Sequence, residues 1–409
     1  MSSKFPKILF ITWDGPQTSY MEGLFLPIFN AVQQQSDYQF HVIQFTWGTP
    51  ERLAVTQRKA HELGITYTAK TILRKPNATF GSVFSLFKGI RFLNRYVKEH
   101  EIDIVMPRST LPAFMVNRMG KGNFKILFDA DGLALDERVD FSGLSRDSRQ
   151  YRFLKSEEKK MLRKADSVIT RSQKAIEIHL KTIGNENLEK FSVVSNGRNT
   201  DFFKPDLEQR TIVRSGFACS DTDRLFVYCG SLGAQYGWRE MLEIFSRYHN
   251  RNQKAKFLIL TGNPEFTYGK IPELLNKNIF VKKVPFEQVP NCLSAADVAF
   301  AIREPKYSMQ GVAPIKLGEY LLMGLPTIAS AGIGDSEDIL TRVPDCFLFR
   351  HDQKSAIANA VTFVEQLGEV KHQVIREYGI RYFSMEKSAV SYIQSLNKLT
   401  DICSKSPQK

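Results

Sequence analysis

Short hydrophobic runs and longer amphipathic stretches alternate through the first half of the chain. The runs end at turn-forming residues, which is typical of buried strands. The stretches between them repeat hydrophobic residues every three or four positions, as helices that cover a sheet do. We therefore predict strands at residues 7–12, 40–45, 65–71, 102–106, 124–128 and 167–169, and helices at 21–35, 51–63 and 83–98. Strands separated by helices in this order form parallel βαβ units.

A segment rich in Asn, Gly, Asp and Pro interrupts this order at residues 193–206, and we interpret it as a linker. The alternation then resumes, with a helix predicted at residues 238–250 and strands at 224–229, 256–261, 279–282, 298–302, 327–330 and 346–349. The pattern predicts an α/β protein of two doubly wound, Rossmann-like domains. Ligands of such domains bind at the carboxyl ends of the strands, so we expect a cleft between the two strand edges.

Charge is unevenly distributed along the 409 residues. The net charge is +13, and residues 1–204 hold 31 basic against 21 acidic side chains. A basic half indicates an anionic partner, which can be nucleic acid, a phosphorylated substrate or an acidic membrane. No hydrophobic stretch is long enough to span a bilayer, the start lacks the pattern of a secretory signal, and the five cysteines have no C-x-x-C spacing. We therefore expect a cytoplasmic protein.

The most specific segment is residues 308–330, where a loop leads into a helix and then into a strand. We expect Glu319 to open this helix and residues 323–326 to end it. A carboxylate near a helix start can accept hydrogen bonds from sugar hydroxyls, and the amides there can hold phosphate. The alternative is a helix-start residue without a chemical role. Four other residues of this segment belong to a pattern that is shared with a known family: Pro314, Lys316, Gly324 and Pro326.

With these residues the segment resembles the donor-site signature of family 4 retaining glycosyltransferases. In that family the second glutamate of an E-x7-E motif binds the ribose hydroxyls of the donor, and Glu319 stands at this position. The first glutamate would fall at Gly311, so the sequence departs from the family there. The resemblance extends to three other segments, namely the linker at 196–203, residues 228–232 and residues 293–298.

The resemblance implies the GT-B fold, in which two Rossmann-like domains face each other across a cleft. We expect an N-terminal acceptor domain at residues 1–204 and a C-terminal donor domain at 205–375. Residues 376–409 would return to the first domain as a helix, after a kink at residues 382–386 that resembles the family's crossing point.

The donor would be a nucleotide diphosphate sugar, used as co-substrate without another cofactor. By resemblance, the family's phosphate-binding arginine and lysine would stand at Ser231 and Tyr236, so both cations are missing. A diphosphate needs counter-charge, and the candidate substitutes are Arg303, Lys316 and, on a helix, Arg239. Each can also be a solvated surface residue. The expected donor site is completed by three glycines whose backbone the nucleotide can approach: Gly15, Gly230 and Gly262.

Two candidates for catalysis follow strands of the first domain. Asp131 lies where relatives often have an aspartate lining the acceptor pocket, and a carboxylate there can orient an attacking hydroxyl. Its alternative is a loop carboxylate that caps the next helix. Arg108 ends another strand and can pair with a phosphate. Asp129 and Asp131 also form a D-x-D tripeptide, which binds metal in other transferases, but the fold that this chain resembles works without metal, so we expect no metal site.

The resemblance implies a hexosyltransferase, retaining and independent of metal, that extends a glycan or a lipid-linked saccharide in the biosynthesis of bacterial surface polysaccharide. One alternative is a nucleotide-sugar epimerase on the same fold, which would act without an acceptor. A second is a nucleic-acid-binding protein, suggested by the charge alone; no basic-aromatic module supports it, and we expect no nucleic-acid partner.

The helix predicted at residues 83–98 suggests a further partner. Its polar side carries four cations at spacings that place them on one face: Lys88, Arg91, Arg95 and Lys98. Val83 begins the apolar face, and Phe84, Phe87, Phe92 and Tyr96 are expected on the flanks. Such a helix can lie at an anionic membrane, which would make the protein peripheral on the inner face of the plasma membrane. The alternative is an ordinary amphipathic helix that packs on its sheet.

Overall fold

The chain folds as two compact units in a computed structural model that describes residues 5–15 and 20–404, with side chains as far as Thr400. Unit 1 runs to Gly197 and takes up the chain again from Ser388, and unit 2 is Arg198–Lys387. The sequence had suggested boundaries after residues 204 and 375. The second one lies later because residues 372–383 pack tightly inside unit 2: a Cβ on Gly379 would lie 2.6 Å from the backbone of Leu321.

Unit 1 is built on a parallel seven-stranded sheet with the order β3-β2-β1-β4-β5-β6-β7 in its described part. The strands are β1 (Lys7–Asp14), β2 (Gln39–Thr46), β3 (Thr66–Thr71), β4 (Ile104–Pro107), β5 (Lys125–Asp131), β6 (Ser167–Thr170) and β7 (Phe191–Val193). The unbroken hydrophobic run of β1 is fully buried from Ile8 to Ile11, because helices cover both faces of such a sheet. Only β7, a three-residue edge strand, was not predicted.

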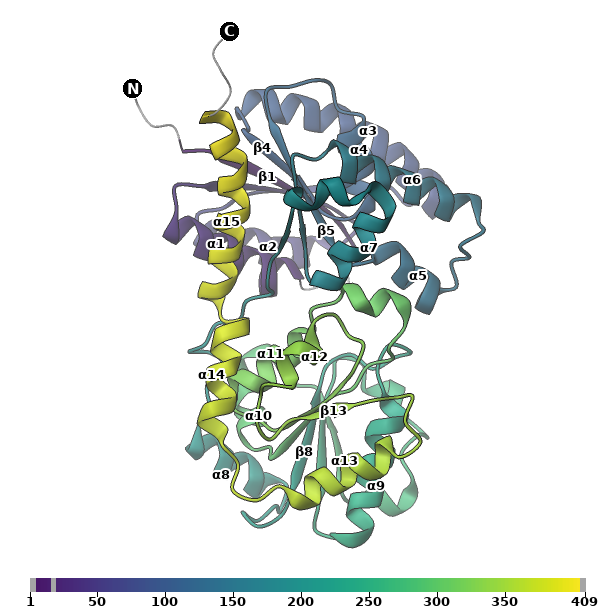
Figure 1. Ribbon diagram of the computed structural model, residues 1–409, viewed down its shortest axis with the longest axis vertical. Coiled ribbons are helices and arrows are strands. Elements are labelled where there is room, and N and C mark those ends of the chain that lie inside the picture. The colour runs from purple at the N-terminus through teal and green to yellow at the C-terminus, as the bar shows by residue number, and fades with distance from the viewer. Residues whose placement is uncertain (1–4, 16–19, 405–409) are drawn as a thin grey trace. The chain divides into compact units, whose positions relative to one another are not determined.

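The helices of unit 1 pack on both faces of this sheet (Figure 1). They are α1 (Leu26–Gln35), α2 (Pro50–Glu62), α3 (Ala78–Glu99), α4 (Thr110–Asn117), α5 (Ala134–Ser142), α6 (Arg149–Lys164) and α7 (Gln173–Ile183). A π-helical turn at Met21–Phe25 precedes α1 within the stretch predicted as one helix.

Helix α3 corrects two expectations about its faces. Val83, predicted on the buried face, is exposed, and Tyr96, predicted on a flank, is buried against His41. The buried face instead includes Gly81, Ser85 and Gly89, small residues that let the helix backbone approach its neighbours closely. The predicted face considered only large hydrophobic residues, and this is why it was rotated.

Unit 2 repeats the architecture with a parallel six-stranded sheet in the order β10-β9-β8-β11-β12-β13 among its described residues. Its strands are β8 (Leu225–Cys229), β9 (Lys256–Leu260), β10 (Ile279–Lys282), β11 (Val298–Ala301), β12 (Thr327–Ser330) and β13 (Phe347–Phe349), as predicted to within a few residues. Its helices are α8 (Leu207–Gly216), α9 (Trp238–Arg251), α10 (Val289–Ser294), α11 (Ile315–Leu322), α12 (Ser336–Leu340), α13 (Ala356–Gln366) and α14 (His372–Phe383).

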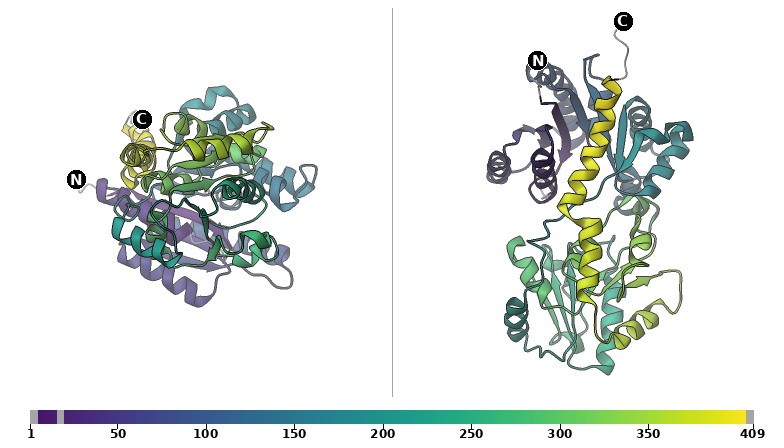
Figure 2. Two further views of the ribbon diagram at one scale, coloured as in Figure 1. Left: turned by 90° about the horizontal axis from the view of Figure 1, so that it is seen from below. Right: turned by 60° about the vertical axis from the view of Figure 1, so that its left-hand side comes forward.

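The chain ends in two consecutive helices, α14 and α15 (Met385–Ser404), drawn in yellow in Figure 2. They meet at Ser384, whose extended backbone makes the predicted kink and whose hydroxyl accepts from the amide of Lys387 at 3.1 Å. From Ser388 on, α15 packs within unit 1: Tyr392 is fully buried, and Tyr38 donates to Asn397 Oδ1 at 2.9 Å. The predicted return of the last helix to the first domain is confirmed.

Candidate functional site

Each sheet has one point at which the strand order changes direction. In unit 1 it lies between β1 and β4, and in unit 2 between β8 and β11. The loops after such neighbouring strands run in opposite directions and leave room for a ligand at the carboxyl edge. The candidate residues Gly15 and Arg108 follow β1 and β4, and Gly230 and Arg303 follow β8 and β11. These four candidates therefore lie where the strand order of their own sheet changes direction.

In unit 2, Glu319 lies at the centre of a buried cluster of charges. It is 1% exposed, and its two oxygens accept from different cations. Oε1 accepts from Arg198 Nε at 3.0 Å, and Oε2 accepts from Lys316 Nζ at 3.0 Å. Because two of about four lone-pair positions are used, the carboxylate keeps the capacity to accept two hydroxyl groups.

The charges of this cluster do not cancel. Burial alone would raise the pKa of Glu319, but Lys316 and Arg198 hold it below its ordinary value. Burial works against the ammonium of Lys316, yet Glu319 raises its pKa above the usual range. One carboxylate and two cations are therefore all ionised at neutral pH. The cluster carries one excess positive charge, which suits an anionic ligand.

The position of Glu319 in its helix differs from the prediction. Helix α11 begins at Ile315, after Pro314 at the cap position, so Glu319 lies in the second turn and does not open the helix. Lys316 occupies the first turn instead. The free backbone amides of a helix start favour an anion, and here a cationic side chain stands beside them.

The loops after β8 and β9 border this cluster. A Cβ on Gly230 would lie 3.6 Å from Lys316 Cε, so the glycine backbone runs next to the lysine. Asn263 ties the two loops together, since its side chain bonds both backbone groups of Leu232. Ser231 and Gly262 are exposed, and no atom would lie within 4 Å of a Cβ on Gly262. The backbone at these positions is open to a ligand.

Arg303 lies beside the segment in which the expected lysine is missing. Its guanidinium carbon stands 5.1 Å from the ring centre of Tyr236, and its Nη2 donates to Gln235 Oε1 at 3.0 Å. The Nε atom is buried without a hydrogen-bond partner among the described residues. Arg303 therefore places a cation next to Tyr236, whereas Arg239, in the first turn of α9, is exposed.

In unit 1 the two catalytic candidates form a direct ion pair. Arg108 Nη2 donates to Asp131 Oδ2 at 2.6 Å, and its Nε lies 4.0 Å from Asp129. Asp129 is completely buried and accepts from Arg171 Nη2 at 2.8 Å. Asp131 is 28% exposed at its side chain, and its second oxygen lies 3.8 Å from Arg171, beyond hydrogen-bond distance. Asp131 is thus the member of the cluster that a ligand can reach.

Backbone strain marks the same place. Asp131 has a φ of 61° and Ser109 a φ of 65°, both in the left-handed region that non-glycine residues rarely adopt. The amide of Ser109 donates to the carbonyl of Asp129 at 2.9 Å, so the two strained residues are neighbours. Such conformations cost about 1–3 kcal/mol each and cluster at functional sites. The strain is consistent with a functional edge at β4 and β5.

Asp14 completes this edge at the end of β1. Its Oδ2 accepts from Thr12 at 2.8 Å and from Gln44 at 3.3 Å, and burial raises its pKa despite the nearby charge of Arg108. Gly15 follows directly, and a Cβ there would lie 3.1 Å from the Trp47 ring, which leaves little room for a larger residue. Pro16, the next residue, lies outside the described residues.

Both aspartates of the D-x-D tripeptide are held by guanidinium groups, so a divalent ion would have to displace Arg108 or Arg171 there. The described residues bring together another set of possible ligands. One side-chain atom each of Glu240, Glu304 and His351 lies within 4.8 Å of the others. His351 also bonds the hydroxyl of Ser330 at 2.9 Å. The prediction that the chain needs no metal stays a prediction.

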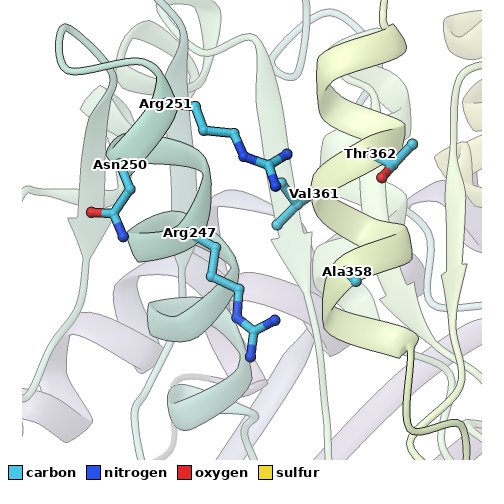
Figure 3. Close-up of a pocket in the computed structure, with 6 residues that line it drawn as sticks. All are labelled: Arg247, Asn250, Arg251, Ala358, Val361 and Thr362. Atoms are coloured by element: carbon cyan, nitrogen blue, oxygen red, sulfur yellow. The ribbon is translucent and has the colours of Figure 1, made fainter.

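A hollow of about 350 Å³ lies away from both strand edges, between α9 and α13 (Figure 3). It is lined by Arg247, Asn250, Arg251, Ala358, Val361 and Thr362. Its two arginines are already paired, Arg247 with Glu243 at 2.6 Å and Arg251 with Glu365 at 2.9 Å. The hollow therefore offers little charge to a ligand and contains none of the candidate residues.

Two arginines of these clusters were not identified from the sequence. Arg198 stands in the segment interpreted as a linker, and no side chain of that linker was considered for the site. Arg171 directly follows β6, as Arg108 follows β4, so the rule that ligands bind at strand ends would have found it. Each pairs with a carboxylate far away in the sequence.

Comparisons with known proteins give a family match for part of unit 2. Residues 223–365 match the family model described as glycosyl transferases group 1. This match confirms, for that segment, the family predicted from the sequence. A search of curated proteins found no significant match.

Solved structures with the same fold cover nearly the whole chain. A glycosyltransferase from Rickettsia africae ESF-5 is 15% identical, with a TM-score of 0.69 over 97% of this chain and 99% of the other. HepE from Anabaena, solved with UDP-glucose, is 12% identical at a TM-score of 0.69, over 97% and 99%. WaaG, a glycosyltransferase involved in lipopolysaccharide biosynthesis, is 15% identical at 0.64, over 98% and 100%. The predicted GT-B fold is confirmed.

Proposed function

We propose that this chain, which over residues 223–365 belongs to the group 1 glycosyltransferases, transfers a hexosyl group from a nucleotide diphosphate sugar to a saccharide or lipid-linked saccharide. The acceptor belongs to surface polysaccharide and is met in the cytoplasm, at the inner face of the plasma membrane. The likeness to HepE, solved with UDP-glucose, and to WaaG, named for lipopolysaccharide biosynthesis, supports this class of donor and acceptor.

The cluster of Arg198, Lys316 and Glu319 carries the proposal. It lies inside unit 2 at the start of α11, beside the glycine that ends β8. Glu319 has the remaining capacity to accept the two ribose hydroxyls, and the excess positive charge of the cluster faces the diphosphate. A carboxylate for hydroxyls and a cation for phosphate, next to each other, match the ribose and the adjoining diphosphate of a nucleoside diphosphate.

Counter-charge for the diphosphate would come from Lys316 and Arg303. Lys316 stands in the first turn of α11, and Arg303 lies against Tyr236, where the family's lysine is missing. When the nucleoside diphosphate leaves, negative charge develops on its phosphate, and fixed cations and helix amides stabilise it. These groups give the reaction counter-charge without a metal ion.

The acceptor side is proposed at Asp131 and Arg108 in unit 1. Arg108 fixes one oxygen of Asp131, and the other remains available to the attacking hydroxyl of the acceptor. We propose retention of the anomeric configuration from the family alone.

Nucleotide binding tests the donor site. Thermal shift with a panel of nucleotide sugars identifies the donor, and calorimetry then gives its Kd with wild type and with Lys316→Met. Loss of one charged contact to phosphate should weaken binding about tenfold or more. Lys316→Met keeps the Arg198–Glu319 pair, so the fold should persist, and Lys283→Met, exposed elsewhere in unit 2, is the matched control.

Three results would contradict the proposal. The first is equal nucleotide affinity in wild type and Lys316→Met. The second is the absence of any nucleotide sugar that stabilises the protein. The third is conversion of a nucleotide sugar into its epimer without an acceptor, which would assign the fold to epimerisation.

A further inference from the structure

Helix α3 carries one continuous outward stripe that changes in character halfway along. The stripe consists of Phe80, Phe84, Phe87, Arg91, Arg95 and Lys98, at spacings of three and four residues. The three phenylalanines are more than half exposed, at 62%, 53% and 54%, and Val83 beside them is 47% exposed. The first half of the stripe is therefore aromatic and the second half cationic.

Packing of the opposite side fixes this orientation. A Cβ on Gly81 would lie 2.2 Å from the carbonyl of Leu73, and one on Gly89 would lie 2.8 Å from Met115 Sδ. Between them the Ser85 hydroxyl accepts from the amide of Leu73 at 2.9 Å. Because this side is pressed against backbone and core, the helix cannot rotate to bury its phenylalanines. Their exposure is built into the fold.

The aromatic surface continues across two neighbouring helices. The ring of Phe87 packs edge-on against the Phe114 ring of α4, with their centres 6.2 Å apart. The centres of the Phe114 ring and the Phe153 ring of α6 are 5.9 Å apart. Phe114 is buried, but Phe153 is 50% exposed. Figure 1 shows α4 next to both α3 and α6, and α4 packs against both. We call the exposed side of α3 and α6 the aromatic–cationic face.

Cations surround these aromatic side chains, whereas the acidic residues of α6 are turned inward. Glu157 accepts from Arg118 at 2.7 Å and Glu158 pairs with Lys155 at 2.6 Å, and both are buried. In α3 the only acidic residue, Glu99, lies 3.6 Å from Arg95. The exposed cations of the face are Lys88, Arg91, Arg95 and Lys98 on α3, and Arg149, Arg152, Lys160 and Arg163 on α6.

We propose that the aromatic–cationic face binds the surface of an anionic lipid bilayer. The phenylalanines and Val83 enter the boundary between headgroups and acyl chains, and the cations of α3 and α6 lie among the lipid phosphates. This contact gives the proposed transferase access to a lipid-linked acceptor, but neither its evidence nor its test involves donor or transfer.

Lipid fits this face better than the other anionic partners do. Exposed phenylalanines in a row gain free energy by leaving water, and each nearby cation adds attraction to anionic headgroups. A nucleic acid can use the cations and stack bases on the phenylalanines, but it offers no apolar medium for Val83. No helix in the described part of the chain is both long and apolar enough to cross a bilayer, so the contact is peripheral.

Sedimentation with vesicles tests the proposal on the full chain. The vesicles consist of phosphatidylcholine alone or of phosphatidylcholine with phosphatidylglycerol. Wild type should bind the anionic vesicles and not the neutral ones. The charge variant Lys88→Glu, Arg91→Glu, Arg95→Glu, Lys98→Glu should bind the anionic vesicles at least tenfold more weakly. The aromatic variant Phe80→Ser, Phe84→Ser, Phe87→Ser should bind only at low salt, because screening weakens the remaining electrostatic attraction.

Matched controls change the same chemistry on unit 2. The control Lys204→Glu, Lys254→Glu, Lys277→Glu, Lys283→Glu removes the same number of exposed cations, and Leu207→Ser, Tyr268→Ser, Leu274→Ser removes three exposed hydrophobic side chains. Both should bind like wild type.

Four outcomes would overturn the proposal. They are no binding of wild type to anionic vesicles, equal binding by the charge variant, an equal loss in the controls, and release of bound protein by a random oligonucleotide at matched phosphate concentration. The last would assign the cations to nucleic acid. None of the vesicle experiments contains nucleotide sugar. A negative result in them therefore does not bear on the nucleotide-binding test of the donor site.

Discussion

The two strand edges carry opposite balances of charge. In unit 1, Asp14, Asp129 and Asp131 outnumber Arg108 and Arg171, whereas in unit 2 the single carboxylate of Glu319 stands between Arg198 and Lys316. In both clusters the charged side chains come from the carboxyl ends of parallel strands or from the loops and helices next to them. The same architecture thus carries an excess of carboxylates at one edge and an excess of cations at the other.

The difference teaches that the fold supplies the place, while a few side chains decide the chemistry. The edge of unit 1 can accept a proton, or a hydrogen bond from a hydroxyl group, because its accessible member, Asp131, is a carboxylate. The edge of unit 2 can hold an anion, because its accessible members are Lys316 and the backbone around Gly230. The following predictions test this contrast, from the largest expected effect to the smallest.

The largest effect is expected from Asp129→Ala. It leaves Arg171 buried with only the more distant Asp131 as counter-charge, and breaking a buried pair costs about 3–5 kcal/mol. Urea unfolding followed by circular dichroism should show unit 1 melting at lower urea, while calorimetry still detects nucleotide binding by unit 2. The exposed Asp37→Ala serves as control. An unfolding curve equal to that of the control would show that the pair contributes little.

Acid should also weaken unit 1 through His41. Burial, with the nearby charges of His100 and Lys7, lowers the pKa of His41 to about 4. Since an ordinary histidine titrates near 6.5, the unfolded chain takes up the proton first. The stability that His41 contributes is therefore complete above pH 6.5 and is lost as the pH falls towards 4, by about 3 kcal/mol.

Urea unfolding at several pH values checks this expectation. His41→Gln should remove that part of the acid sensitivity, whereas His61→Gln, at an exposed position, should keep the wild-type pH profile. A profile of His41→Gln that still falls as steeply as wild type between pH 6.5 and 4 would refute the assignment.

Asp131→Asn should lower the rate of transfer without changing nucleotide binding, and so distinguish the role of the unit 1 edge from that of the unit 2 edge. We expect kcat for transfer to fall about a hundredfold, or by about 2.7 kcal/mol in activation free energy, because the amide cannot take the proton of the acceptor hydroxyl. The Kd of the nucleotide should stay the same, since unit 2 is unchanged. Asp147→Asn, exposed in unit 1, is the control. A loss of nucleotide affinity without a loss of kcat would reverse the proposed roles.

The smallest effect is expected from Arg303, the cation proposed to replace the lysine that is missing at Tyr236. Arg303→Met should raise the nucleotide Kd about tenfold, because its guanidinium lies against Tyr236. Arg239→Met, at an exposed position in the next helix, should change it roughly twofold or less. Equal effects of the two would mean that general charge, and not position, attracts the diphosphate.

The sequence predicted the sheets well because buried parallel strands are short hydrophobic runs that are easy to recognise. It also selected Glu319, Lys316, Asp131 and Arg108, since each belongs to a local pattern or ends a strand, and the structure pairs Glu319 with Lys316 and Asp131 with Arg108. It missed the partners of two carboxylates, because Arg198 lies 121 residues from Glu319 and Arg171 lies 42 from Asp129. Hydrophobic periodicity carries no information about such pairs.

The prediction of local detail was wrong where small residues form the packed face of a helix. Val83 was expected to be buried, but Gly81 and Gly89 occupy the inward side of α3, where close backbone approach replaces large side chains. The start of α11 was misplaced for a related reason. Pro314 fixes the cap, and this moves Glu319 into the second turn.

The discontinuity of unit 1 has a consequence for synthesis on the ribosome. Unit 2 is inserted between Gly197 and Ser388, so all of its residues emerge before the last helix that unit 1 needs. Until then unit 1 lacks Ala389, Tyr392 and Leu396, each of which is fully buried in the finished protein. The domain that begins first is therefore completed last. A released chain truncated just before Ser388 would contain the whole second domain but leave an open hydrophobic groove in the first, which makes it a substrate for chaperones.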